Sequence, residues 1–108
     1  MFGKKKLGSI FDRPALSASL AAGNSSKAIV SGGANGICGA EVRESTGSAA
    51  TAWRLRDGTV TGTILCVLGA PSGSTASAYF PPQGVQVLTG IIFAENVSGS
   101  GELVVWYG

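Results

Sequence analysis

Two strand-like runs joined by an Asp-Gly turn constrain the fold of this chain more than any other feature. Residues 53–56 read Trp-Arg-Leu-Arg, the period-two alternation of a β-strand with one face in water. Asp57-Gly58 supplies residues suited to a tight reversal. The return run, residues 64–68, is apolar on both faces, so we expect both of its sides to be covered by a partner sheet or by a neighbouring subunit.

The remainder of the chain repeats this β pattern. Its 108 residues suffice for one domain, and 17 glycines between short apolar runs favour strands and turns over helices. About eight such runs, spaced as in a sandwich or jelly roll, follow residue 28. We therefore predict an all-β chain: a single, jelly-roll-like β-sandwich of about eight short antiparallel strands at residues 28–108, behind an extended basic N-terminal arm at residues 1–27.

The predicted arm differs from the body in charge. It holds five basic residues and one acidic residue, net +4, whereas residues 28–108 hold three basic and five acidic residues, net −2. The small-residue tract 15–23 suits at most a helical turn or two and is marginal in isolation. We expect the arm to order on an acidic partner protein. Its contacts would be the charges of Lys4, Lys5, Lys6 and Arg13 and the apolar side chains of Leu7, Ile10 and Phe11.

Low charge indicates a subunit of an assembly. Charged residues make up 13% of the chain, about half the roughly 25% of an average soluble domain, so much of the surface is neutral. Two runs near the C-terminus, residues 90–97 and 102–107, are apolar on both faces, as in central or interface strands. We expect a homo-oligomer, most simply a trimer. The expected core or interface residues are Trp53, Ile92, Val104 and Trp106.

The sequence offers few residues that could act in catalysis or bind a metal ion. The chain has no histidine, which removes the commonest general base and the commonest zinc ligand. Cys38 and Cys66 lie in apolar runs, so we expect buried thiols rather than a metal site or a disulfide. Glu41 and Glu44, three apart on a strand, point to opposite faces and cannot act as an acid–base pair. We expect no enzyme activity and no cofactor.

Membranes and nucleic acids are not expected partners. No run approaches the ~20 apolar residues of a membrane span, and no continuous apolar core of a signal peptide follows the N-terminal lysines. Three lysines release too few counterions for firm nucleic-acid binding. Trp53, Tyr79 and Trp106 could instead line a sugar-binding face, although aromatic side chains more often lie in cores or interfaces.

Several short motifs resemble those of small virion proteins of tailed bacteriophages. They are GAEVRESTGSAATAWRLRDGT at residues 39–59, Thr61-Gly-Thr-Ile-Leu65, Tyr79-Phe-Pro-Pro-Gln-Gly84 and Thr89-Gly-Ile-Ile92. Such proteins are β-sandwiches and include capsid decoration (cement) proteins and other head or tail surface components. The resemblance covers residues 36–108 and leaves residues 1–27 outside it.

This resemblance implies a phage structural protein that binds and stabilises the outer head shell. Its partner would be the major capsid protein or another virion protein. Its place would be the capsid surface, after assembly in the host cytoplasm. Two alternatives stay open: a head–tail connector or tail/fibre component, which differs in copy number, and a carbohydrate-binding adhesion module on the virion surface.

Overall fold

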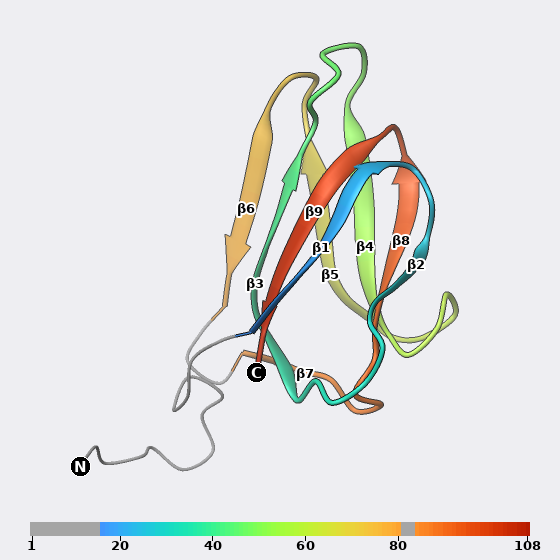
Figure 1. Cartoon of the computed structure of the whole chain (residues 1–108), viewed down its shortest axis with the longest axis vertical. Helices are drawn as coiled ribbons and strands as arrows, with labels where there is room; N and C mark the ends of the chain where they lie inside the picture. Colours follow the sequence, from blue (N-terminus) through green and yellow to red (C-terminus); the bar gives the residue numbers. More distant parts are fainter. Residues whose placement is uncertain (1–15, 81–83) are drawn as a thin grey trace, which may run out of the picture.

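The computed structural model describes residues 16–80 and 84–108, which form two antiparallel β-sheets packed face to face (Figure 1). These ranges contain nine strands and no helix, so the predicted all-β sandwich is confirmed. The strands are β1 (Leu16–Gly23), β2 (Lys27–Val30), β3 (Gly36–Arg43), β4 (Thr51–Asp57), β5 (Ile64–Ala70), β6 (Thr75–Tyr79), β7 (Val85–Gln86), β8 (Ile92–Ser98) and β9 (Gly101–Tyr107).

Each sheet contains strands from distant parts of the chain. Sheet A has the order β1-β9-β3-β6, with the short β7 also paired to β3, and sheet B has the order β2-β8-β4-β5. In sheet A, Ala40 lies opposite Val105, and in sheet B, Leu55 lies opposite Ala94. All four side chains are buried, because each sheet turns its apolar alternate positions toward the other.

The tract at residues 16–23 is a strand, so the prediction of helical turns there is wrong. Leu16 pairs with Tyr107 and Leu20 with Leu103, which makes β1 an edge of sheet A. Pairing with β9 satisfies the backbone of this tract, and tertiary context overrides its weak local preference. The described sandwich therefore begins at Leu16 rather than at residue 28. The residues named above for arm binding, Lys4 to Arg13, lie outside the described residues.

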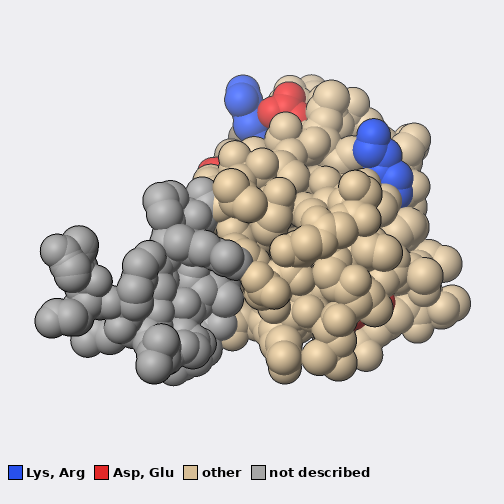
Figure 2. Space-filling view, turned by 60° about the horizontal axis from the view of Figure 1, so that its bottom comes forward, with Lys and Arg blue, Asp and Glu red and all other residues tan. Residues whose placement is uncertain are grey.

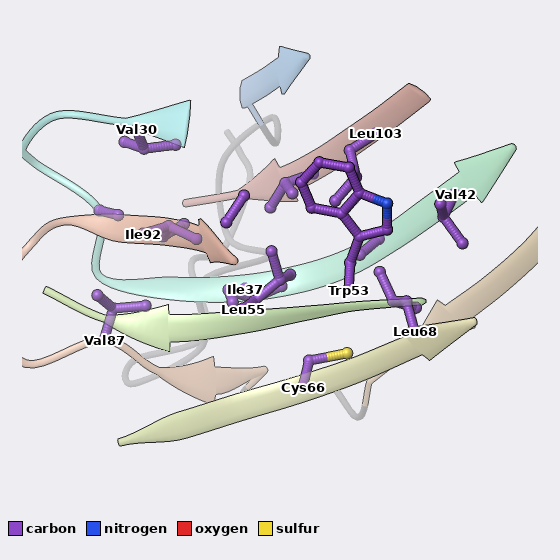
Figure 3. Packing of buried hydrophobic residues seen from close by; sticks show 14 of the residues in the cluster. Val30, Ile37, Val42, Trp53, Leu55, Cys66, Leu68, Val87, Ile92 and Leu103 are labelled. Atoms are coloured by element: carbon purple, nitrogen blue, oxygen red, sulfur yellow. The ribbon is translucent and has the colours of Figure 1, made fainter. Parts of the chain in front are cut away.

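The core lies between the sheets and is centred on Trp53 (Figure 3). Trp53 and Ile92, two of the residues predicted for the core or an interface, are both fully buried. The indole Nε1 of Trp53 donates a hydrogen bond of 2.9 Å to Thr51 Oγ1, whose hydroxyl donates to the Ser98 carbonyl at 3.1 Å. The one polar atom of this large side chain is thus paired inside the core.

The predicted hairpin is formed by β4 and β5, but its turn is longer than an Asp-Gly reversal. β4 ends at Asp57, β5 begins at Ile64, and residues 58–63 form the loop. Gly58 has a φ of 92°, as its place in the turn predicts. Gly62 makes the closest approach: a Cβ there would lie 1.8 Å from the Asp57 carbonyl oxygen, so a side chain cannot fit.

Strand β5 is covered on one face only within this chain. Cys66, Leu68 and Ala70 are buried against the core, whereas Val67 on the other face is 67% exposed. No partner sheet covers that face among the described residues, so the first of the two predicted coverings is wrong. A neighbouring subunit remains the other prediction.

One end of the sandwich, the basal end, consists of three loops and the C-terminal residue. It comprises residues 31–35, 58–63, 87–91 and Gly108, at the bottom of Figure 1. Backbone hydrogen bonds connect these segments: Ala34 N to Gly90 O, 3.0 Å; Val87 N to Asn35 O, 2.9 Å; Asn35 N to Gly108 O, 2.7 Å; Gly58 N to Ile91 O, 3.0 Å. The basal end is therefore a connected structure rather than a set of separate loops.

The opposite, apical end is organised by the buried carboxylate of Glu44. Its oxygens accept hydrogen bonds from the Thr46 hydroxyl, from Gly47 N at 2.8 Å and from Gly73 N at 2.8 Å. The Thr46 hydroxyl first, and then the Gly73 N–H, lower the pKa of Glu44 to about 2, against the opposing effect of burial. Glu44 thus joins the loop after β3 to the turn after β5.

Candidate functional site

The four residues predicted for the core or an interface lie in two different places. Trp53 and Ile92 lie in the core, whereas Val104 and Trp106 lie on the outer face of sheet A and are partly exposed. Tyr79 lies on the same outer face, because it pairs with Gly39, which in turn pairs with Trp106. Of the three aromatic residues considered for a sugar-binding face, Trp53 is therefore excluded, and Tyr79 and Trp106 are brought together.

Tyr79 and Trp106 form an exposed aromatic pair over Gly39. Their ring centroids are 6.0 Å apart and their planes differ by 26°, although β3 lies between their strands. The missing side chain of Gly39 makes the approach possible: a Cβ there would lie 2.9 Å from Tyr79 Cδ1. Tyr79 remains 72% exposed. We call these three residues the aromatic platform.

An open groove continues from the platform along the same strands. It has a volume of about 380 Å³, and Glu41, Arg43, Thr75, Glu102 and Val104 line it. An exposed ion pair lies in the groove, with Arg43 Nη1 4.0 Å from Glu102 Oε1. Two residues along a strand span ~7 Å, so the groove lies directly beside the platform. The surface offers an apolar ring face and, next to it, carboxylate, guanidinium and hydroxyl groups.

The outer face of sheet B is organised by one carboxylate. Glu95 Oε1 lies 2.8 Å from Arg56 Nε and 3.0 Å from Arg54 Nε. The hydrogen bond from Arg56, aided by the charges of both guanidinium groups, lowers the pKa of Glu95. Arg56 Nη1 also donates to the Gly62 carbonyl at 2.7 Å, which ties the loop 58–63 to this face. Because these charged side chains form ion pairs with one another, we assign them a structural role.

The basal end displays apolar side chains on a surface with few charges. Leu88 is 78% exposed and Val60 on the neighbouring loop is also exposed. Figure 2 looks toward this end, and on the described surface seen there the charged side chains are few and lie mostly along its upper border. Chain segment 1–15 joins the sandwich at this end, because Leu16 lies opposite Tyr107, next to the basal Gly108.

The described residues form no metal-binding cluster, and their two thiols are buried. Across residues 16–80 and 84–108, no group of three or more Cys, Asp or Glu side chains could hold a metal ion. Cys38 and Cys66 are both buried, as predicted, and no disulfide joins them in the described chain. Burial raises the pKa of the Cys66 thiol, which makes it less reactive.

Sequence reasoning missed Gly39 and Leu88. A glycine flanked across the sheet by two aromatic residues becomes visible only once the register is known. In the sequence Leu88 looks like an ordinary apolar strand residue, because no neighbouring residue shows that its N–H donates a hydrogen bond to Asp57.

No helix in the described part of the chain is long and apolar enough to cross a membrane. Comparison with protein-family models, curated proteins and solved structures found no match.

Proposed function

We propose that this chain is a structural protein of a tailed-phage virion, a capsid decoration protein that attaches to the outer head shell through its basal end. The observation that carries the proposal is Leu88, an exposed leucine whose backbone N–H is hydrogen-bonded to Asp57, at an end of the sandwich with few charged side chains. The phage context itself comes from the sequence motifs. The exposed apolar side chains of the basal end support the proposal that this end binds a protein.

Exposing a large apolar side chain on a fixed loop is unfavourable for an isolated subunit. Burying a leucine is worth about 1.5–3 kcal/mol, and a loop whose backbone is already ordered loses little entropy on binding. The buried centres of protein interfaces are more apolar than the rest of the surface and poor in charged residues. The basal end therefore has the properties of a preformed docking surface.

The N-terminal segment is proposed to bind the same partner. Residues 1–15 carry four basic residues and one acidic residue and join the sandwich at the basal end. We propose that Lys4, Lys5 and Lys6 bind the same partner as Leu88. Charge would accelerate encounter and the apolar groups would slow dissociation.

Self-association is proposed through the outer face of β5, at the edge of sheet B. Val67 is largely exposed there, and the edge position leaves one side of β5 without a strand partner in the described chain. A trimer would place several basal ends on the shell at once, and multivalency would then raise the overall affinity.

A binding assay on particles that lack this chain tests the proposal. Purified wild-type protein should co-sediment with such particles at high occupancy, in many copies that follow the capsid subunits, whereas a connector would bind as a single ring. Leu88→Ser should weaken binding at least about tenfold. Val97→Ser is the matched control, because Val97 is also exposed but lies near the other end of β8. Full binding by Leu88→Ser would exclude the basal end as the attachment site.

A further inference from the structure

We propose that the outer face of sheet A is a carbohydrate-binding site, in which a pyranose ring stacks on the Tyr79–Trp106 platform and the next sugar unit lies in the adjoining groove. This inference goes beyond attachment to a particle, since it concerns a different surface. The platform and the groove lie on β9, β3 and β6. Glu102 and Thr75 of the groove lie near the starts of β9 and β6, at the apical end of these strands in Figure 1, whereas Trp106 and Tyr79 lie near their other ends.

The platform has the geometry that a sugar ring requires. The C–H groups on one face of a pyranose are apolar and weakly positive, so they pack on the negative face of an aromatic ring. Tyr79 and Trp106 present two nearly parallel rings, one of them 72% exposed. Gly39 lets these rings approach each other across β3, because a Cβ would displace Tyr79. Aromatic residues without a ligand more often turn into the core, as Trp53 does.

The groove supplies hydrogen-bonding partners for hydroxyl groups. Glu41 and Glu102 offer acceptors, Arg43 offers donors and Thr75 offers both. Glu41 lies opposite Val104, two positions along β3 and β9 from Gly39 and Trp106. That offset is ~7 Å, so an oligosaccharide longer than one sugar ring can occupy platform and groove together.

The residues around the platform favour a neutral polyol over other ligands. Ser17 and Ser19 on β1 and Ser77 on β6 share this face, as their registers with Trp106, Val104 and Glu41 show. Two carboxylates against one guanidinium in the groove repel a phosphate backbone. Small hydroxyl side chains around a single aromatic pair offer little apolar area for a protein partner. The chemical class indicated is therefore a flat, uncharged oligosaccharide with equatorial hydroxyl groups.

Titration with two soluble probes, cellotetraose and chitotetraose, tests the site through tryptophan fluorescence. Trp106 lies in the platform and Trp53 is buried with its N–H bonded, so a change in emission reports on Trp106. We expect saturable quenching by at least one probe at about millimolar concentration, as suits an open site, with calorimetry giving the same affinity. No saturable signal with either probe up to ~10 mM would overturn the proposal.

Matched variants locate the binding. Tyr79→Ala should weaken binding at least about tenfold, whereas Tyr79→Phe, which keeps the ring, should bind within about threefold of wild type. Val97→Ser, exposed on the other sheet, is the control and should bind as wild type. Glu41→Ala tests the groove independently and should weaken binding by several-fold. Wild-type affinity in both Tyr79→Ala and Glu41→Ala would exclude this face. Particle binding by the same variants stays intact, which separates this test from that of Leu88.

Discussion

Asp57 holds Leu88 in place: its Oδ2 accepts a hydrogen bond of 2.8 Å from the Leu88 N–H, across 31 positions of sequence. Its other oxygen accepts from Thr89 N at 3.0 Å and from the Thr89 hydroxyl at 2.6 Å. The last residue of β4 therefore determines how the loop 87–91 presents its leucine. The Thr89 hydroxyl, and then the two backbone N–H groups, lower the pKa of Asp57 against the effect of burial.

Asp57→Ala should loosen the basal loop while the sandwich stays folded. We expect a loss of about 1 kcal/mol in the free energy of unfolding, since hydrogen bonds to a partly exposed carboxylate are weakened by solvent. Amide hydrogen exchange should accelerate at Leu88 and Thr89 but not at Val105 in the core. Thr61→Ala, in the neighbouring loop, is the control. Unchanged exchange at Leu88 would show that the loop holds its position without Asp57.

Glu44 predicts an acid-dependent loss of stability. Because its folded-state pKa is about 2 and its ordinary value is 4.5, Glu44 stabilises the native state above pH 4.5, and this contribution falls as the pH drops toward 2. Glu44→Gln should therefore be less stable than wild type at pH 7. This difference in unfolding free energy should shrink as the pH falls from 4.5 to about 2. Urea unfolding at a series of pH values measures it. A difference independent of pH would contradict the assignment.

Two adjacent residues on β9 provide a matched pair for the core. Leu103 is completely buried and Val104, the next residue, faces outward. Leu103→Ala should cost about 2–5 kcal/mol of unfolding free energy, whereas Val104→Ala should cost less than about 1 kcal/mol. Equal effects in chemical denaturation would mean that the outer face of sheet A is covered in solution, as an oligomer through that face would require.

Removal of residues 1–13 tests the part of the chain that precedes the described sandwich. The deletion leaves β1 intact, so the truncated protein should fold with an unchanged circular dichroism spectrum. We expect it to keep its oligomeric state and to lose retention on particles, because the charges of Lys4, Lys5, Lys6 and Arg13 and the apolar Leu7, Ile10 and Phe11 go with it. Full occupancy by the truncated protein would assign attachment to the basal loops alone.

The alternation of side chains along the strands was sufficient to predict the fold class. Trp53 and Leu55 face the core and the arginines between them face out, as a period of two requires. The same reasoning failed at residues 16–23, where small side chains carry almost no periodic signal. What makes that tract a strand is the free edge of β9, and an edge at the other end of the chain is invisible to a local pattern.

The candidate sites could be predicted only in part, because both depend on register between distant strands. Residue type alone indicated Tyr79, Trp106 and Trp53 as candidates for a sugar-binding face. The structure is needed to show that Trp53 is buried. Gly39 acquires its role through its position between them. Leu88 becomes notable through a carboxylate that precedes it by 31 positions. Neither arrangement has a signature within a short stretch of sequence.

The pairing of β1 with β9 has a consequence for how the protein is made. The first described strand can complete its side of sheet A only after Tyr107 has emerged from the ribosome, since its hydrogen-bonding neighbour is the last of the described strands. Until then the earlier strands lack β9, which lies between β1 and β3 and closes the sheet. Sheet A is therefore expected to form only once β9 is available, and at the slow rate of topologies dominated by distant pairings. During that interval the aliphatic side chains of β3 and β1 are open to chaperones.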